Sequence, residues 1–280
     1  MSTGPRTDSP SPDELGAHYA GGYEARRTET GYGKMERERS MEILLRHLPR
    51  PPAVVLDVGG GPGVYACWLA RLGYPVHLID PVPLHVEHAR RASSAQPSHP
   101  VRTVEVGDAR SLPWKDGGAD AAILFGPLYH LTERTDRVRA LKEALRVLRP
   151  GGVLFAAAVS RFASTFDGVF RGFLDDPAFE RIAERDRRDG QHRNPTGNPA
   201  YFMDTFFHHP DELKAEVAEA GFRVRAVYGV EGPGWLLQDF DRHWNDEGRR
   251  LRLLEAARAV ETEPSLLGMS AHILAVAGRG

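Results

Sequence analysis

The stretch that decides the fold is Val54-Val55-Leu56-Asp57-Val58-Gly59-Gly60-Gly61-Pro62-Gly63, in which four apolar residues surround one carboxylate and glycines follow. A short β-branched run bounded by turn residues predicts a buried strand. The glycines predict a sharp turn at which the backbone approaches a ligand closely. From 64 to 72 the apolar residues have helical spacing, so the unit is a strand, a glycine loop and a helix. In α/β sheets a nucleotide-like ligand binds at such a loop, at the carboxyl ends of the strands.

The loop differs from the usual phosphate-binding loops. A P-loop needs Gly-Lys-Ser/Thr after four spacer residues, and this stretch has no such lysine. The dinucleotide-binding fingerprint needs glycine at its sixth position for close helix packing, and that position, counted from Gly59, is Val64. Asp57 would repel a pyrophosphate and attract an ammonium or sulfonium group. The loop therefore favours a nucleoside with a cationic tail, for which S-adenosylmethionine (SAM) is the obvious candidate.

The segment Asp57-Val58-Gly59-Gly60-Gly61-Pro62-Gly63 resembles the first motif of the class I SAM-dependent methyltransferases, and the resemblance extends from about Tyr19 to Ala277. It implies a transferase with a Rossmann-like α/β fold, whose seven-stranded, mostly parallel sheet carries helices on both faces. It also implies SAM as the methyl donor and S-adenosylhomocysteine as the product. Strand-like and helix-like segments alternate along the core, which is the pattern of such a sheet.

The composition indicates one large α/β domain or a core domain with additions. The chain has 280 residues, 41% of them hydrophobic, which allows a sizeable core. Its net charge of -2 argues against a general nucleic-acid binder. The single cysteine, Cys67, allows no internal disulfide, and no apolar run approaches the roughly 20 residues of a membrane span. We expect a cytoplasmic protein, monomeric or homodimeric, with no metal site, no nucleic-acid partner and no membrane contact.

The chain divides into three predicted parts. Residues 1–13, rich in Ser, Pro, Thr and Gly, predict a disordered N-terminus. Residues 14–52 predict a helical cap, with an amphipathic helix from Met35 to His47. Residues 53–280 predict the SAM-binding methyltransferase domain, with acceptor-side insertions at 161–206 and 230–266. The expected strands span 53–58, 76–79, 101–106, 119–125, 153–159, 222–228 and 271–277, the last two as a hairpin-like pair.

Acidic residues follow two further strands and are candidates for holding the cofactor. Asp80 ends the second strand, and the resemblance makes it the ligand of the ribose hydroxyls, with Pro81 beside it. A turn-forming Asp before proline is the alternative. Asp108 follows the third strand, and the resemblance implies that it takes the adenine amino group while the N–H of Ala109 reaches a ring nitrogen. The glycine loop adds four predicted cofactor-binding residues: Asp57, Gly59, Gly61 and Gly63.

The end of the fourth strand, Phe125-Gly126-Pro127-Leu128-Tyr129-His130, faces the transferred methyl group in the family. The resemblance implies that Phe125 and Gly126 contact the cofactor, with carbonyls near Gly126 holding the methionine ammonium. His130 is the first candidate for a proton acceptor, because a neutral imidazole titrates near working pH. A structural or helix-capping histidine is the alternative. In the N-terminal cap, Tyr23 and Arg27 are expected to close over the cofactor or merely to cover the sheet edge.

Five residues are predicted to contact the acceptor: Tyr19, His208, His209, Glu231 and Trp235. Glu231 and Trp235 could bind a polar or cationic acceptor, Trp235 through a cation–π contact, although a turn and a core aromatic are the alternatives. The adjacent His208 and His209 point to different sides, so they are not expected to share a metal.

Three classes of function compete. A small-molecule methyltransferase is favoured by the large aromatic-rich insertions, with methylation at O or N expected and methylation of an activated carbon as the alternative. A methyltransferase of protein or RNA, and a SAM-binding cyclase or binding protein of the same fold, stay open. The missing Asn/Asp-Pro-Pro-Tyr/Phe signature after the fourth strand argues against methylation of a nucleobase amino group. An NAD-dependent oxidoreductase is opposed by Asp57 and by Val64 in place of glycine.

Overall fold

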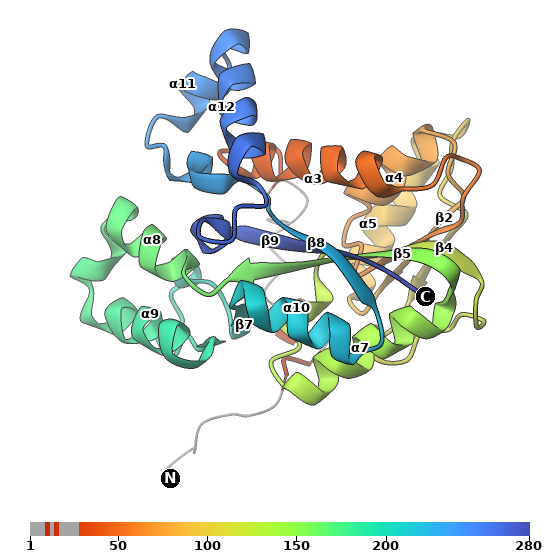
Figure 1. Ribbon diagram of the computed structural model, residues 1–280, viewed down its shortest axis with the longest axis horizontal. Helices are drawn as coiled ribbons and strands as arrows, with labels where there is room; N and C mark the ends of the chain where they lie inside the picture. The colour runs from red at the N-terminus through yellow and green to blue at the C-terminus, as the bar shows by residue number, and fades with distance from the viewer. Residues whose placement is uncertain (1–8, 12–13, 17–27) are drawn as a thin grey trace.

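A computed structural model describes residues 9–11, 14–16 and 28–280 of this chain. They form an α/β fold in which a twisted sheet lies between layers of helices (Figure 1). The predicted contacts of Tyr19, Tyr23 and Arg27 lie outside the described residues, as does most of the predicted disordered N-terminus.

Five parallel strands form the centre of the sheet in the order β3-β2-β1-β4-β5. They are β1 (Val55–Val58), β2 (Val76–Asp80), β3 (Thr103–Val106), β4 (Ala119–Leu124) and β5 (Leu148–Ser160). The strand order reverses between β1 and β4, which is the point where open α/β sheets bind their ligands. All five strands lie where the sequence predicts strands, with β5 beginning earlier.

Two antiparallel strands complete the far side. The strand β8 (Arg223–Gly229) pairs with β9 (His272–Gly278), and β9 pairs with β5. This confirms the predicted hairpin-like pair. The mostly parallel, Rossmann-like sheet with helices on both faces is confirmed as well.

The predicted number of seven strands is wrong, because the described sheet has nine. The two additional strands are β6 (Gln191–His192) and β7 (Thr205–His208), which lie within the predicted insertion 161–206. The sequence did not predict these strands. The strand β6 is too short to show an alternation of polar and apolar residues. The strand β7 is buried throughout, so it shows no polar face, and it pairs in parallel with only the last two residues of β5.

Helices cover the two faces of the sheet and bury its alternating side chains. One face is covered by α3 (Gly33–His47), α4 (Val64–Arg71) and α5 (Pro83–Ser94), which pack against Val55 and its neighbours. The other face is covered by α7 (Arg134–Val147) and α10 (Pro210–Glu219), which pack against Leu56 and Val58. Successive strand residues point to opposite faces, so both cores are built from the same strands.

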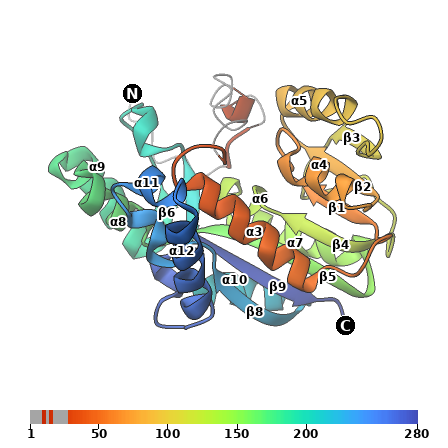
Figure 2. The same cartoon turned by 90° about the horizontal axis from the view of Figure 1, so that it is seen from above.

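Two groups of elements gather at the end of the sheet away from the C-terminus (Figures 1 and 2). The first contains α8 (Ala163–Arg171), η1 (Phe173–Asp175), α9 (Pro177–Asp189) and η2 (Pro199–Tyr201). The second contains η3 (Gly232–Leu236), α11 (Phe240–Trp244), α12 (Glu247–Val260) and η4 (Leu267–Met269). The short helix α6 (Pro127–His130) follows β4 directly. Within the described part of the chain, no helix is both long and apolar enough to cross a membrane.

Candidate active site

A cavity lies where the loops after β1, β2, β3 and β4 meet, at the carboxyl edge of the sheet. Ten residues predicted from the sequence line it: Asp57, Gly59, Gly61, Asp80, Pro81, Asp108, Ala109, Phe125, Gly126 and His130. Pro10, Leu15 and Thr28 from the N-terminal part of the described chain line it as well. Parallel strands bring their carboxyl ends to one edge, so residues far apart in sequence share this space.

The glycine loop lies directly against the loop that follows β4. Gly59 has a φ of 70°, and a Cβ atom built on it would lie 2.7 Å from Cδ of Pro127. A Cβ on Gly60 would lie 2.8 Å from the carboxyl group of Asp57. The glycine loop therefore packs closely against the Pro127 ring and a buried carboxylate, and its approach to a ligand stays a prediction. Gly63 does not line the cavity, because it precedes α4 and packs against Ala89 of α5.

Replacing Gly59 by alanine is expected to lower the free energy of unfolding by about 2–4 kcal/mol, because strain at positive φ adds to the collision with Pro127. Gly151 is the matched control, since its φ is 78° and a Cβ there would meet no atom within 4 Å. Gly151→Ala should therefore lose only the strain, about 1 kcal/mol. Urea unfolding of both variants measures the difference, and equal losses would show that the loop contact does not matter.

Within the described residues, Asp57 is a buried carboxylate that no cation and no well-placed hydrogen-bond donor compensates. It is 1% exposed, and neither oxygen accepts a hydrogen bond of ordinary geometry, although the Ala66 N–H points toward it. Burial, and then the nearby charge of Asp80, raise the pKa of Asp57 to about 7. A buried acid in this state favours a cationic group beside it, because such a group would supply the missing counter-charge.

Asp80 connects the end of β2 to the glycine loop. One oxygen accepts a hydrogen bond from the Gly61 N–H at 2.8 Å, and the other accepts from the Val82 N–H at 2.9 Å and contacts His85 Nδ1 at 3.1 Å. The contact with the Val82 N–H forms the turn that the sequence offered as the alternative role of Asp80. An ionised carboxylate has about four acceptor positions, so these contacts leave room for a ligand hydroxyl. His85 also lines the cavity, although no motif in the sequence marks it as a site residue.

Asp108, after β3, is held by an arginine that sequence reasoning missed. Arg110 donates to both carboxylate oxygens of Asp108 and, at 2.7 Å, to Asp136. Burial alone would raise the pKa of Asp108, but the hydrogen bonds from Arg110 outweigh it and lower the pKa. Asp108 is therefore a fixed anion at the rim of the cavity, with Arg110 lining the cavity beside it.

The end of β4 contributes aromatic side chains and His130. The ring of Phe125 meets Tyr65 edge-on with centroids 5.0 Å apart, and the Tyr129 hydroxyl donates to the Phe125 carbonyl at 3.0 Å. His130 lies at the end of α6, with its ring 4.6 Å from that of Tyr129. The structure thus brings His130 to the cavity, and its role as proton acceptor stays a prediction.

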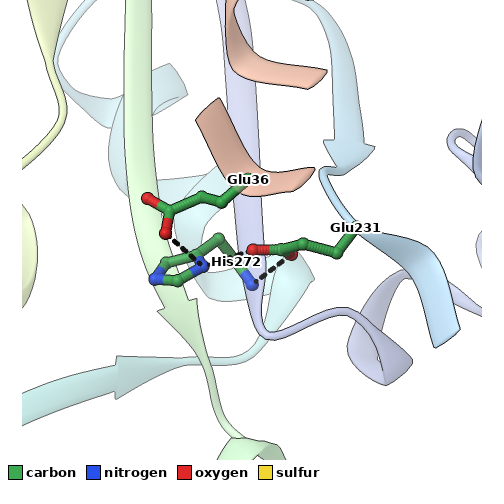
Figure 3. Close-up of side chains that lie close together, drawn as sticks. All are labelled: Glu36, Glu231 and His272. Atoms are coloured by element: carbon green, nitrogen blue, oxygen red, sulfur yellow. Dashed lines mark hydrogen bonds and ion pairs between the residues drawn. The ribbon is translucent and has the colours of Figure 1, made fainter. Parts of the chain in front are cut away.

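A second group of polar residues lines the cavity where α3 meets the last two strands. His272, at the start of β9, has its Nδ1 atom 2.6 Å from Oε1 of Glu231 and 3.8 Å from Oε2 of Glu36 (Figure 3). Glu36 and His272 line the cavity, and Glu231 is fully buried behind them. Within the described residues these three also form a group whose ligand atoms are close enough to hold a metal ion. Sequence reasoning found Glu231 and missed its two neighbours.

The structure corrects the predictions for three acceptor residues. His208 is completely buried in β7 and contacts Glu216 at 3.3 Å, so it is part of the core and not of the cavity. His209 caps α10 by accepting a hydrogen bond from the Asp211 N–H. Trp235 is a buried core aromatic, which was the alternative to a role in binding the acceptor. Its Nε1–H donates to the Met269 carbonyl at 2.9 Å.

Comparison with known proteins gives consistent matches. A family model described as a methyltransferase domain matches residues 56–156. A ubiquinone/menaquinone biosynthesis C-methyltransferase of Acidiphilium cryptum is 37% identical over 202 residues, covering 68% of this chain and 76% of that protein. A malonyl-(acyl-carrier protein) O-methyltransferase of Geobacter sulfurreducens is 35% identical over 178 residues, covering 63% and 58%. The solved (4+2)-cyclase SpnF has a TM-score of 0.62 at 18% identity over 98% of this chain and 99% of that one, a likeness of fold alone.

Proposed function

Because the chain belongs to the class I SAM-dependent methyltransferases, we propose that it moves the methyl group of SAM to an oxygen or nitrogen atom of a small-molecule acceptor. The observation that carries the proposal is one cavity lined by two groups of residues. The unpaired Asp57 of β1 and the loops after β1, β2 and β3 line the part that we call the cofactor end, and His130 of α6 and His272 of β9 line the part that we call the acceptor end. A methyl donor and an acceptor must meet in one water-poor space, and this cavity offers both binding regions.

The cofactor end fits a nucleoside with a cationic tail. The buried, unpaired carboxylate of Asp57 suits the charged methionine end of SAM, and side chains at Gly59 and Gly60 would collide with Pro127 and with Asp57 itself. We assign the ribose hydroxyls to Asp80, the adenine amino group to Asp108 with the Ala109 N–H, and the methionine ammonium to carbonyls near Gly126. Phe125, Gly61 and Pro81 line the same end. Bound SAM supplies an electrophilic methyl group on a sulfonium.

The acceptor end supports a small molecule rather than a polymer. Pro10, Leu15 and Thr28 from the N-terminal part of the chain line the cavity together with residues at the strand ends. The cavity is therefore enclosed by the N-terminal segment as well as by the edge of the sheet. A net charge of -2 gives no general attraction for nucleic acid. The two relatives named above are described as a C-methyltransferase and an O-methyltransferase, so the acceptor atom needs a direct test.

The first test is ligand binding. SAM and S-adenosylhomocysteine are expected to raise the Tm in a thermal-shift assay, since a ligand at a hundredfold excess over its Kd stabilises by about 2.7 kcal/mol. NAD⁺ serves as the control and should not raise the Tm. Stabilisation by NAD⁺ alone would contradict the assignment of the cofactor end.

The second test is turnover. Purified protein is incubated with SAM labelled in the methyl group and with a catechol, a hydroquinone, a primary arylamine, an aliphatic carboxylic acid, bulk tRNA or a basic peptide. Methylated product, identified by mass spectrometry, is expected from at least one small molecule and at an oxygen or nitrogen. Product from tRNA or peptide alone would refute the small-molecule acceptor. Binding of SAM without any product would favour the cyclase or binding-protein alternative.

A further inference from the structure

We infer that Glu231 and His272 form an acid–base pair at the acceptor end of the cavity, in which His272 removes the proton of an O–H or N–H acceptor. The inference rests on the proposed function, because it specifies how the acceptor end of that cavity works. It names a residue, His272, that lies more than a hundred positions from His130 in the sequence and on a different strand end.

The orientation of Glu231 is fixed on every side. Its Oε2 atom accepts hydrogen bonds from the Ser270 hydroxyl at 2.6 Å and from the His272 backbone N–H at 3.0 Å. The Ser270 hydroxyl in turn accepts from the backbone N–H groups of Glu231 and Gly232. With 0% exposure, the carboxylate cannot turn toward solvent, and its Oε1 atom is left directed at the imidazole.

This contact selects the form of the imidazole. An ionised carboxylate oxygen can only accept a hydrogen bond. At 2.6 Å from Oε1 of Glu231, Nδ1 of His272 therefore carries the ring proton and donates a hydrogen bond to that oxygen. Glu36 approaches Nδ1 from α3 as well, while Nε2 lies on the side of the ring away from Glu231 (Figure 3). A neutral ring with the proton on Nδ1 has its basic lone pair on Nε2, which is the arrangement of a carboxylate-oriented general base.

The charges around the ring support the step. Two carboxylates of the described chain, those of Glu36 and Glu231, approach the imidazole within 4 Å. The adjacent strand β5 contributes Val159, which is apolar, and the buried Arg39 of α3 donates to the Val230 carbonyl and pairs with Glu42 and Glu261. An imidazolium formed at His272 would thus be stabilised by two carboxylates.

The proton transfer balances the methyl transfer. The acceptor oxygen or nitrogen forms a bond to the methyl carbon as the carbon–sulfur bond breaks, and that bond's electron pair stays on sulfur. The acceptor's proton passes to Nε2 of His272, giving an imidazolium that later releases the proton to solvent. Product and S-adenosylhomocysteine leave neutral at the reacting atoms, and no oxidant or further reactant is required.

The same three side chains could offer atoms to a divalent ion, and the contacts favour a proton. A metal between these groups would need a lone pair on Nδ1, which carries the proton directed at Glu231, and an oxygen of Glu231, whose other oxygen already accepts from Ser270. Binding an ion would therefore require the pair to separate.

The first experiment reads the tautomer by NMR and needs no acceptor. In protein labelled with ¹⁵N-histidine and saturated with S-adenosylhomocysteine, the His272 signals, assigned by their loss in His272→Gln, should show the Nδ1–H tautomer when the ring is neutral. Glu231→Gln should reduce that preference. A dominant Nε2–H tautomer would overturn the inference. So would selective broadening of His272 by MnCl₂ at concentrations that leave the exposed His99 unaffected, because it would indicate a metal site.

The second experiment measures kcat and KM against pH with the best acceptor from the turnover panel. His272→Gln should lower kcat by about 100-fold or more and remove the acidic limb of the profile. Glu231→Gln should lower kcat by roughly tenfold with little change in KM, and should move that limb to lower pH. His99→Gln is the control for histidine replacement at the surface.

His130→Gln, measured in parallel, separates the two candidate bases. The acidic limb should persist in His130→Gln and vanish in His272→Gln, and the reverse result would overturn the inference. A wild-type profile in His272→Gln would also overturn it while leaving the methyltransferase assignment intact. If wild-type protein binds SAM but methylates nothing, the proposed function fails, and the tautomer measurement still decides whether the pair exists.

Discussion

Replacing Asp57 by asparagine is expected to stabilise the cofactor-free protein at neutral pH while weakening its binding of SAM at least tenfold. Both effects have one cause. The carboxylate is buried, unpaired and near Asp80, so its ionised form is unfavourable until a cation lies beside it. An amide has nearly the same shape and no charge, so the variant removes the electrostatic cost together with the attraction.

The pH dependence follows from the direction of the shift. The pKa of Asp57 is raised from 3.8 to about 7 in the folded protein, so between these values the folded state holds a proton that the unfolded chain has released. Stability is therefore lost as pH rises through this window, by at most about 4 kcal/mol at 1.36 kcal/mol per pKa unit. Asp57→Asn should be close to wild type near pH 4 and about 2–4 kcal/mol more stable above pH 7.

Urea unfolding from pH 4 to 8.5 measures the first effect, and calorimetric titration with SAM measures the second. Wild-type affinity for SAM should rise with pH up to about 7, as Asp57 ionises, and this rise should be absent in the variant. The ligand's own amino group titrates near 8 in both cases, so the difference between the proteins isolates Asp57.

Asp186→Asn is the matched control, because Asp186 is equally buried but accepts hydrogen bonds from Ser164 and His192. It should destabilise the protein, since the contacts of the Oδ2 atom with Ser164 and His192 are disturbed, although Oδ1 has no partner in the described chain. A loss of stability in Asp57→Asn, or unchanged SAM affinity, would contradict the interpretation of the cofactor end.

The cofactor end of the cavity was largely predictable from the sequence. Asp57, Asp80 and Asp108 each come at or next to the end of a parallel strand, and parallel strands end at one edge, so their meeting requires no knowledge of side-chain packing. The sequence pattern could not predict which partners each carboxylate has. Asp57 is unpaired, Asp80 is tied to Gly61 and Asp108 is held by Arg110, and only coordinates distinguish these environments.

Most residues of the acceptor end could not be predicted from the sequence. Glu231 meets His272 because the hairpin pairs Gly229 with Ile273, and that register depends on a turn formed by a long insertion rather than by a two-residue loop. Aligning the last two predicted strands as an antiparallel pair would have brought Glu231 near His272. Glu36 comes from a helix whose angle on the sheet no periodicity specifies. The histidines chosen instead, His208 and His209, belong to a short buried strand and a helix cap.

Replacing Arg137 by methionine is expected to be the most destabilising of the changes considered. It should lower the free energy of unfolding by about 3–5 kcal/mol, because it leaves the buried carboxylate of Glu216 without its counter-charge. Arg137 is 2% exposed, donates to both oxygens of Glu216 and stacks over Phe206 at 3.6 Å. It also donates to the carbonyls of Leu131 and Thr132, directly after His130. The loss should therefore loosen the loop that positions His130 as well as the packing of α7 on α10.

Glu216 shows how much the pair matters. Burial alone would raise its pKa, but hydrogen bonds from His208 and Arg137 lower it from 4.5 to about 2. A lowered pKa in the folded state contributes stability that is fully present above pH 4.5 and is lost as pH falls toward 2. The wild-type protein should lose this contribution in acid, whereas Arg137→Met should lose stability mainly at neutral pH, where the stranded carboxylate is charged.

Double-mutant urea unfolding separates a stranded charge from a lost contact. Glu216→Met in the Arg137→Met background should recover part of the loss, since two apolar side chains can replace a buried ion pair at little cost. Arg134→Met is the control on the same helix, because Arg134 is 56% exposed, pairs with Glu219 at the surface and reaches Glu216 only at 3.9 Å, so little loss is expected. If the double variant were less stable than Arg137→Met, packing around the guanidinium rather than its charge would govern this region.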